Sequence, residues 1–399
     1  MIDWNILVSQ IATVAFDIVY FGAIISTIVV IILDNRNPVK TMAWILILLF
    51  LPIVGLVFYF FFGRSQRRER IIGQKSYDRL LKKPMAEYMA QDCSDVPEEY
   101  ARLIQLFQHT NQAFPFEGNR IAVYTEGYTK LQSLLRELQK AKQHIHIEYY
   151  IFEDDAIGRL VRDVLIEKAS QGVEVRVIYD DVGCWHVPNR FFEEMRNAGI
   201  EVRSFLKVRF PLFTSRVNYR NHRKIVVIDG RIGFVGGMNL AERYMRGFSW
   251  GIWRDTHILI EGKAVHGLQT AFLLDWYFVD RTLITASRYF PKIESCGSSL
   301  VQVVTSEPIG PWKEIMQGLT MAINGAKKYF YMQTPYFLPT EQVLAAMQTA
   351  ALAGVDVRLM LPERADNRIT HLGSHSYLAD VMQAGVKVYF YKKGFLHSK

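Results

Sequence analysis

The pattern of hydrophobic and polar positions divides the chain into three kinds of segment, and the first is apolar. Residues 4–33 are mostly apolar, with Asp17 as the one charged residue, and residues 41–62 carry no charge. Because about 20 apolar residues are enough to cross a bilayer, each segment predicts a membrane-spanning helix. The polar link 34–40 predicts the turn, so we expect a two-helix transmembrane hairpin over residues 1–63.

The second kind of segment is polar and helical, and the third alternates between strands and helices. Residues 64–118 are rich in charge, with an apolar stripe at helical spacing formed by Tyr100, Leu103, Ile104 and Phe107. They predict a helical connector. From residue 119 onward, apolar helical stripes alternate with short β-branched runs. The expected fold class is therefore α/β. The first expected elements are a helix over 131–138, strands over 145–152 and 173–179, helices over 160–165 and 191–195, and a strand over 200–205.

The later part of the chain repeats this pattern. Residues 172–177 match 354–359, and residues 198–202 match 384–388. An internal duplication is the economical interpretation. We expect two β/α lobes packed together, over 119–290 and 291–399.

One stretch in the first lobe carries residues that packing alone does not require. Residues 225–228 form a β-branched run typical of a strand buried on both faces. Side chains alternate along a strand, so His222 and Lys224 point the same way, and Asp229 follows the run. A neutral imidazole can attack phosphorus and form a covalent phosphohistidine intermediate, and a lysine can hold the phosphate charge. A carboxylate can orient an imidazole, and the stretch needs no metal or other cofactor.

The duplication predicts a second copy of this pattern after Val388, and His397-Ser398-Lys399 provides it. The matching aspartate would fall five residues beyond Lys399, where the sequence ends. We therefore expect the sequence to be a fragment that ends inside its second motif.

The combined motifs resemble those of the phospholipase D superfamily, and the surrounding sequence resembles that of bacterial cardiolipin synthases. The resemblance rests on the following residues: His222-x-Lys224-x4-Asp229 with Gly236-Gly237-x-Asn239, the runs 209–211 and 218–224, and Trp253-Arg254-Asp255-Thr256-His257. The resemblance implies transfer of a phosphatidyl group between two phosphatidylglycerol molecules. It also implies that His222 is the nucleophile and His397 the general acid and base. Lys224 and Lys399 would hold the phosphate, and Asp229 would orient an imidazole of its own or of the facing motif. Gly237 departs from the serine common in the superfamily.

Composition and charge agree with a membrane lipid as the substrate. The net charge is +8 and the three cysteines are far apart, which favours anionic partners and no disulfide framework. The link holds two basic residues, whereas eight follow within residues 64–83, and this excess predicts that both termini lie inside the cell. We expect a multi-pass protein of the bacterial inner membrane with its catalytic part in the cytoplasm and no nucleic-acid partner.

Cations interleaved with aromatic residues over 207–219 are typical of a surface that admits an anionic lipid. We expect Arg209, Arg220 and Asn239 to bind substrate. The sequence leaves three alternatives open: a phospholipase D that uses water as acceptor, a nuclease of the same superfamily, and an inactive lipid-binding scaffold. It also leaves the oligomeric state open.

Overall fold

The structure is a computed structural model. It describes residues 4–34, 38–59, 96–207, 220–307 and 312–399. The chain separates into two compact units, the first formed by residues 1–70 with 208–219 and the second by residues 71–207 with 220–399.

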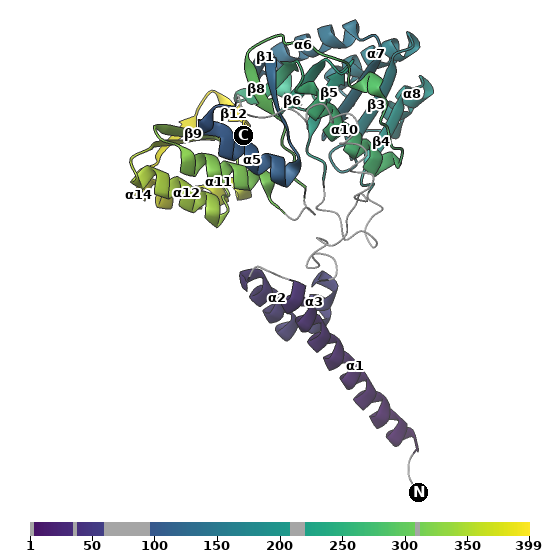
Figure 1. The fold of residues 1–399 in the computed structure, drawn as a ribbon. Helices are drawn as coiled ribbons and strands as arrows, with labels where there is room; N and C mark the ends of the chain where they lie inside the picture. The colour runs from purple at the N-terminus through teal and green to yellow at the C-terminus, as the bar shows by residue number, and fades with distance from the viewer. Residues whose placement is uncertain (1–3, 35–37, 60–95, 208–219, 308–311) are drawn as a thin grey trace. The chain divides into compact units, whose positions relative to one another are not determined.

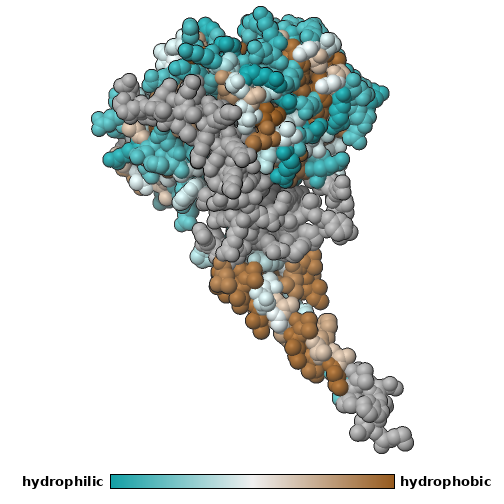
Figure 2. Space-filling model, turned by 45° about the vertical axis from the view of Figure 1, so that its right-hand side comes forward, coloured by the Kyte–Doolittle hydropathy of each residue, from teal (hydrophilic) through white to brown (hydrophobic). Residues whose placement is uncertain are grey.

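The first unit contains the apolar N-terminal helices α1 (Trp4–Asp34), α2 (Pro38–Phe50) and α3 (Pro52–Phe58). Within α1, Gln10–Leu33 is long and apolar enough to cross a membrane, which suggests membrane anchoring. The outward surface of these helices is hydrophobic, as the brown colour in Figure 2 shows.

The second predicted span is interrupted. Helix α2 has 13 residues, about 20 Å at 1.5 Å per residue, whereas a bilayer core is about 30 Å thick. Pro52 begins α3; because a proline lacks an N–H and clashes with the preceding helical turn, it ends the regular helix there. The structure therefore supports the predicted hairpin only in its first helix.

The second unit is built on a nine-stranded sheet, counted over the described residues, with the strand order β4-β3-β2-β5-β6-β7-β1-β8 and with β12 paired to β7. The strands are β1 (Pro115–Glu126), β2 (His144–Tyr149), β3 (Glu174–Asp180), β4 (Glu201–Phe205), β5 (Lys224–Ile228), β6 (Ile232–Gly236), β7 (Ile252–Glu261), β8 (Ser299–Gln302) and β12 (Gly394–Leu396). Their helices are α5 (Glu98–Asn111), α6 (Gly127–Lys140), α7 (Ala156–Ser170), α8 (Asn189–Asn197), α9 (Arg243–Arg246), α10 (Val265–Asp280) and the short η3 (Ser287–Tyr289).

Helices cover both faces of this sheet (Figure 1). The apolar sides of α6, α7 and α8 pack with alternate residues of β2 and β3 in the largest core cluster, and α10 packs on the opposite face of β5. Two-sided burial explains why β5, Lys224–Ile228, is buried at every position. The predicted β/α alternation is thus present, and the helix and strand boundaries extend or shorten the predicted ones by a few residues.

A second, three-stranded sheet has the order β11-β10-β9. It contains β9 (Tyr329–Gln333), β10 (Asp356–Pro362) and β11 (Lys387–Tyr391), with helices α11 (Glu314–Gly325), α12 (Glu341–Leu352), α13 (Arg368–Ser376) and α14 (Leu378–Gln383). These three strands are parallel, as are β2, β3 and β4 in the first part. Both parts therefore repeat one strand order, as the duplicated sequence pattern predicts.

Strand β7 joins the two halves. It pairs antiparallel with β6, and it pairs parallel with β12 so that Leu396 lies opposite Arg254. The residues that follow β12 therefore reach the same edge of the sheet as the residues around β6 and β7.

Candidate active site

His222 lies at the edge of the large sheet where β2 ends. Strand β5 runs antiparallel to β2 and begins opposite Tyr149, so the residues just before β5 lie at the carboxyl end of β2. The rings of His222 and Tyr150 are 4.7 Å apart, and the Lys224 ammonium lies 5.3 Å from the Tyr150 ring centre. Lys224 Nζ donates to the His222 carbonyl at 2.5 Å. The first His-x-Lys pair is therefore one packed group around Tyr150.

His397 is held at this edge by β7. Its backbone N–H donates to the Arg254 carbonyl at 2.7 Å, which places its side chain beside the next residue of β7, Asp255. The Asp255 Oδ2 lies 2.7 Å from His397 Nδ1, and the two residues are 1% and 8% exposed. Lys399 Nζ lies 3.4 Å from both ring nitrogens of His397. The second motif thus forms an oriented and buried carboxylate–imidazole pair.

Groups of the second motif contribute to the pKa values of the first. Partial burial, followed by the charges of Lys224, Lys399 and His397, lowers the pKa of His222 to about 3. Burial, followed by Lys399, lowers the pKa of Lys224 to about 7. Burial lowers the pKa of Lys399 as well. Charges of the second motif thus act on groups of the first, which agrees with a shared basic site in which His222 is neutral.

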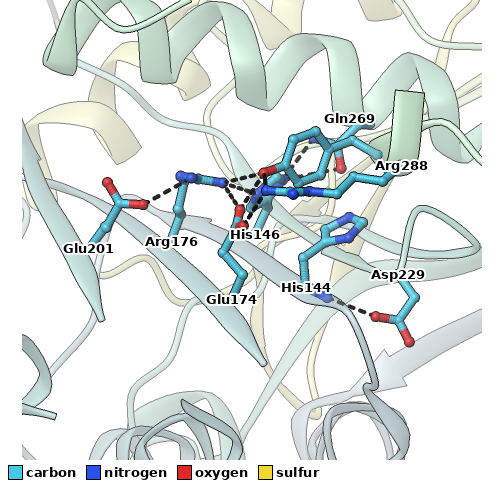
Figure 3. Close-up of polar contacts among 9 residues, drawn as sticks. His144, His146, Glu174, Arg176, Glu201, Asp229, Gln269 and Arg288 are labelled. Atoms are coloured by element: carbon cyan, nitrogen blue, oxygen red, sulfur yellow. Dashed lines mark hydrogen bonds and ion pairs between the residues drawn. The ribbon is translucent and has the colours of Figure 1, made fainter. Parts of the chain in front are cut away.

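The prediction that Asp229 orients an imidazole is wrong. Its carboxylate accepts the backbone N–H groups of Lys142, Gln143 and His144 at 2.8 to 2.9 Å, so it fixes the start of β2. Figure 3 shows this carboxylate beside His144. Six residues separate it from His222, five of them in β5, so the two side chains lie at opposite ends of that strand. Its role is structural, and the carboxylate that contacts an imidazole of the site is Asp255.

The predicted substrate-binding residues have different surroundings. Asn239 is buried, accepts the Ile151 N–H at 3.0 Å and donates to the Tyr244 hydroxyl. An amide nitrogen carries two hydrogens, so this contact leaves one for a phosphate oxygen. Arg220 donates to the Leu206 carbonyl at 3.3 Å and pairs with Asp180 at 3.6 Å. Arg209 lies outside the described residues.

The space for a serine at position 237 is occupied. A Cβ on Gly237 would lie 2.1 Å from Asp255 Oδ1. The Gly237 N–H donates to the Thr256 carbonyl at 2.8 Å, so it does not replace the missing hydroxyl. Gly237 is therefore explained by the close approach of the carboxylate that holds His397.

Sequence reasoning also missed a buried network behind His222. Asn221 donates to Glu148 and Asp275, and Arg223 pairs with Asp275. Burial, followed by the charge of Asp275, raises the pKa of Glu148 well above its ordinary range. Asn221 and Arg223 flank His222, so this network fixes the backbone that carries the nucleophile candidate. The available signal was Glu148, the one acidic residue of strand β2.

The two histidines of β2, His144 and His146, are packing residues. His146 Nδ1 lies 2.8 Å from the Gln269 amide nitrogen, and its Nε2 lies 3.2 Å from Arg176 (Figure 3). The His144 and His146 rings are 4.8 Å apart. Across the described ranges, no group of three or more His, Cys, Asp and Glu side chains is arranged to hold a metal ion.

Comparison with known proteins decides the family. The family model described as "Cardiolipin synthase, PLD-like domain" matches residues 134–275 and 319–399, more than half of the chain. The chain belongs to the cardiolipin synthase family. A second model, "Phospholipase_D-nuclease N-terminal", matches residues 22–64.

Members of this family are similar to the chain over nearly its whole length. Cardiolipin synthase of Geobacillus kaustophilus is 41% identical over 96% of this chain and 78% of the relative. Major cardiolipin synthase ClsA of Bacillus subtilis is 36% identical over 98% of this chain and 83% of the relative. Phosphatidylserine synthase of Haemophilus influenzae shares the fold, with a TM-score of 0.52 at 14% identity over 75% of this chain and 79% of that structure.

Proposed function

We propose that this protein is a cardiolipin synthase that transfers a phosphatidyl group from one phosphatidylglycerol to the hydroxyl of another and releases glycerol. The proposal is supported by the contact of His397 with Asp255 at 2.7 Å and by the effect of Lys399 and His397 on the pKa of His222, which favour one site shared by both His-x-Lys motifs. The names of the relatives supply the substrate class, and phosphatidylglycerol and other anionic lipids are the expected partners.

In the first step, His222 attacks the phosphorus of one phosphatidylglycerol. An N–P bond forms, the P–O bond to the glycerol headgroup breaks, and the leaving oxygen takes a proton from the His397 imidazolium. Burial, followed by the surrounding cations, lowers the pKa of His222 and so favours its neutral form, which is the protonation state of a nucleophile. Lys224 and Lys399 hold the non-bridging oxygens as charge builds on them.

In the second step, the hydroxyl of a second phosphatidylglycerol attacks the phosphohistidine. His397 accepts the hydroxyl proton, the N–P bond breaks, and cardiolipin leaves with His222 free again. A buried carboxylate stabilises an imidazolium, so the contact with Asp255 supports His397 as the acid and base. The reaction returns every group to its initial state, and no metal or cofactor takes part.

The membrane arrangement is part of the proposal. We assign residues 1–63 to an anchor that crosses the membrane twice, 64–118 to a connector, and 119–290 and 291–399 to two phospholipase D-like lobes in the cytoplasm. The 24-residue apolar segment Gln10–Leu33 supports the first crossing. Cysteine scanning with a membrane-impermeant reagent tests the second, since residues 34–40 would be labelled only from outside the cell.

Product analysis tests the reaction. The full chain in phosphatidylglycerol vesicles is expected to yield cardiolipin and glycerol with EDTA present. His222→Ala abolishes both products, and His109→Ala, which removes an exposed imidazole on α5, leaves them unchanged. Phosphatidic acid in place of cardiolipin would show that water is the acceptor, and no turnover by the full chain would contradict both reactions.

A further inference from the structure

Helix α13 has its apolar residues on the wrong side for a helix of a soluble domain. Ile369 and Leu372, three positions apart on one face, are 81% and 67% exposed, whereas Ser374 is 3% exposed. Such helices normally bury the aliphatic face and expose the polar one. The helix is well formed, because the Asn367 side chain caps its first turn by accepting the N–H groups of Ile369 and Thr370. The exposed aliphatic residues therefore belong to a regular, capped helix.

The polar side of α13 is attached to the loop that borders the active site. Ser374 Oγ accepts the Phe337 N–H at 2.9 Å. The Tyr336 hydroxyl donates to Asp366 just before the helix at 2.7 Å, and the Tyr336 ring lies 6.3 Å from the ring of His397. A single side chain, that of Tyr336, thus lies between the start of α13 and the His397 imidazole.

A third aliphatic residue extends the exposed face toward the site. Leu338 is 51% exposed and packs against α13, since a Cβ on Gly373 would lie 2.9 Å from its Cδ2. We call Leu338, Ile369 and Leu372 the apolar lip. The nearby cations Arg364 and Arg368 are exposed, and Arg364 lies over the Trp250 ring at 5.9 Å. Aliphatic residues flanked by arginines match the acyl chains and phosphates at the surface of an anionic bilayer.

We propose that the apolar lip inserts into the bilayer surface beside the active site, so that a lipid phosphate reaches His397 while its acyl chains stay in the membrane. The proposal builds on the proposed function and adds the surface through which the substrate arrives. Its occupant is a bilayer that contains anionic phospholipid. Tyr336 links this surface to the imidazole, because its hydroxyl contacts Asp366 before α13 and its ring lies 6.3 Å from the ring of His397.

An exposed leucine at the far end of β10 provides a matched control. Leu352 at the end of α12 is 74% exposed. Helix α12 precedes β10 in the chain, whereas α13 follows β10. The seven residues of β10 span roughly 20 Å, and the two leucines lie on helices that precede and follow this strand. Both side chains are exposed leucines on helices, so they differ in location and not in chemistry.

The first test measures depth in the membrane. The full chain, with Leu372→Trp or with Leu352→Trp, is reconstituted in phosphatidylglycerol vesicles whose acyl chains carry bromine, which quenches tryptophan on contact. After subtraction of the parent signal from its seven tryptophans, the added fluorescence of Leu372→Trp is expected to be quenched at least about twofold more, because it reaches the acyl region. Equal quenching at the two positions would overturn the proposal. This readout needs no turnover, so it stays interpretable if the proposed reaction is wrong.

The second test measures turnover by an Ile369→Ser, Leu372→Ser double variant, with Leu352→Ser as control. Cardiolipin formation from vesicles is expected to fall about tenfold, since two buried aliphatic contacts with the membrane are lost. Formation from short-chain phosphatidylglycerol dissolved as monomers is expected to stay unchanged. Equal loss on both substrates, or no loss on vesicles, would contradict the lip. Absence of product with the parent chain on both substrates would contradict the proposed function instead.

Discussion

Replacing Asp255 by asparagine tests the division of roles between the two histidines. The carboxylate lies 2.7 Å from His397 Nδ1, and both side chains are almost fully buried. At an effective dielectric constant of about 20, a carboxylate and an imidazolium with charges roughly 4 Å apart attract one another by about 4 kcal/mol. Asparagine keeps the shape and loses this charge. An increase of roughly 1.36 kcal/mol in the activation free energy lowers the rate tenfold. We therefore expect Asp255→Asn to lower kcat by a factor of about 10² to 10³.

The assay compares two leaving groups. Glycerol must be protonated as it leaves, whereas p-nitrophenolate leaves without a proton, so the release of p-nitrophenol from a phosphatidyl-p-nitrophenol substrate does not need an acid. We expect Asp255→Asn to lose glycerol release and to keep most of the first burst of p-nitrophenol. Asp163→Asn, an exposed carboxylate on α7, serves as control. An equal loss on both substrates would refute the assignment of His397 as the acid.

Three further predictions follow from buried charged groups. Asp229→Ala removes the acceptor of three backbone N–H groups, so we expect it to lower stability by about 2 to 4 kcal/mol with kcat within about threefold; a loss of kcat in the folded variant would restore its catalytic role. Burial and the charge of Asp275 raise the pKa of Glu148 on folding, so the stability of the wild type falls as the pH rises above the ordinary glutamate range. Glu148→Gln lacks this loss. The Tm of Glu148→Gln minus the Tm of the wild type should therefore increase from about pH 5 to about pH 8. Burial lowers the pKa of Lys224 to about 7, so the charged lysine destabilises the folded state most below that pH. Lys224→Met should therefore raise Tm most at low pH and less as the pH rises toward the ordinary lysine range, and it should abolish turnover. An unchanged Tm would show that the ammonium is not desolvated.

The positions of both histidines could be predicted because the information is local. The spacing His222-x-Lys224 precedes a β-branched run, and the repeat of the pattern locates His397. Alternation along a strand then places each lysine on the side of its histidine. Both parts of that inference need only short sequence segments and no knowledge of strand pairing.

The carboxylate could not be assigned in this way. Asp229 is close to His222 in sequence and lies at the opposite end of β5, whereas Asp255 is 142 residues from His397 and meets it through the pairing of β12 with β7. Strand pairing across that separation leaves no periodic signal in the sequence. For the same reason the space limit at Gly237, which depends on the Asp255 side chain, was not predictable.

The interruption of the second apolar segment had a visible signal. Pro52 stands in the middle of residues 41–62, and a proline at the first turn of a helix commonly marks a helix start. Hydropathy alone counts the apolar residues and ignores this marker. The length of an uncharged segment is therefore a weaker guide to a single helix than the location of its proline.

The two lysines of the site connect substrate binding to the state of the nucleophile. Their charges help to lower the pKa of His222 to about 3, and the charge of Lys399 helps to lower that of Lys224 to about 7. An anionic phosphate placed between them relieves this repulsion, so the substrate favours the charged form of both ammonium groups. In the proposed reaction, binding of a phosphodiester therefore recovers the free energy that like-charge repulsion costs the empty site. A site with one lysine would bind the phosphate less strongly and would also leave its histidine more basic.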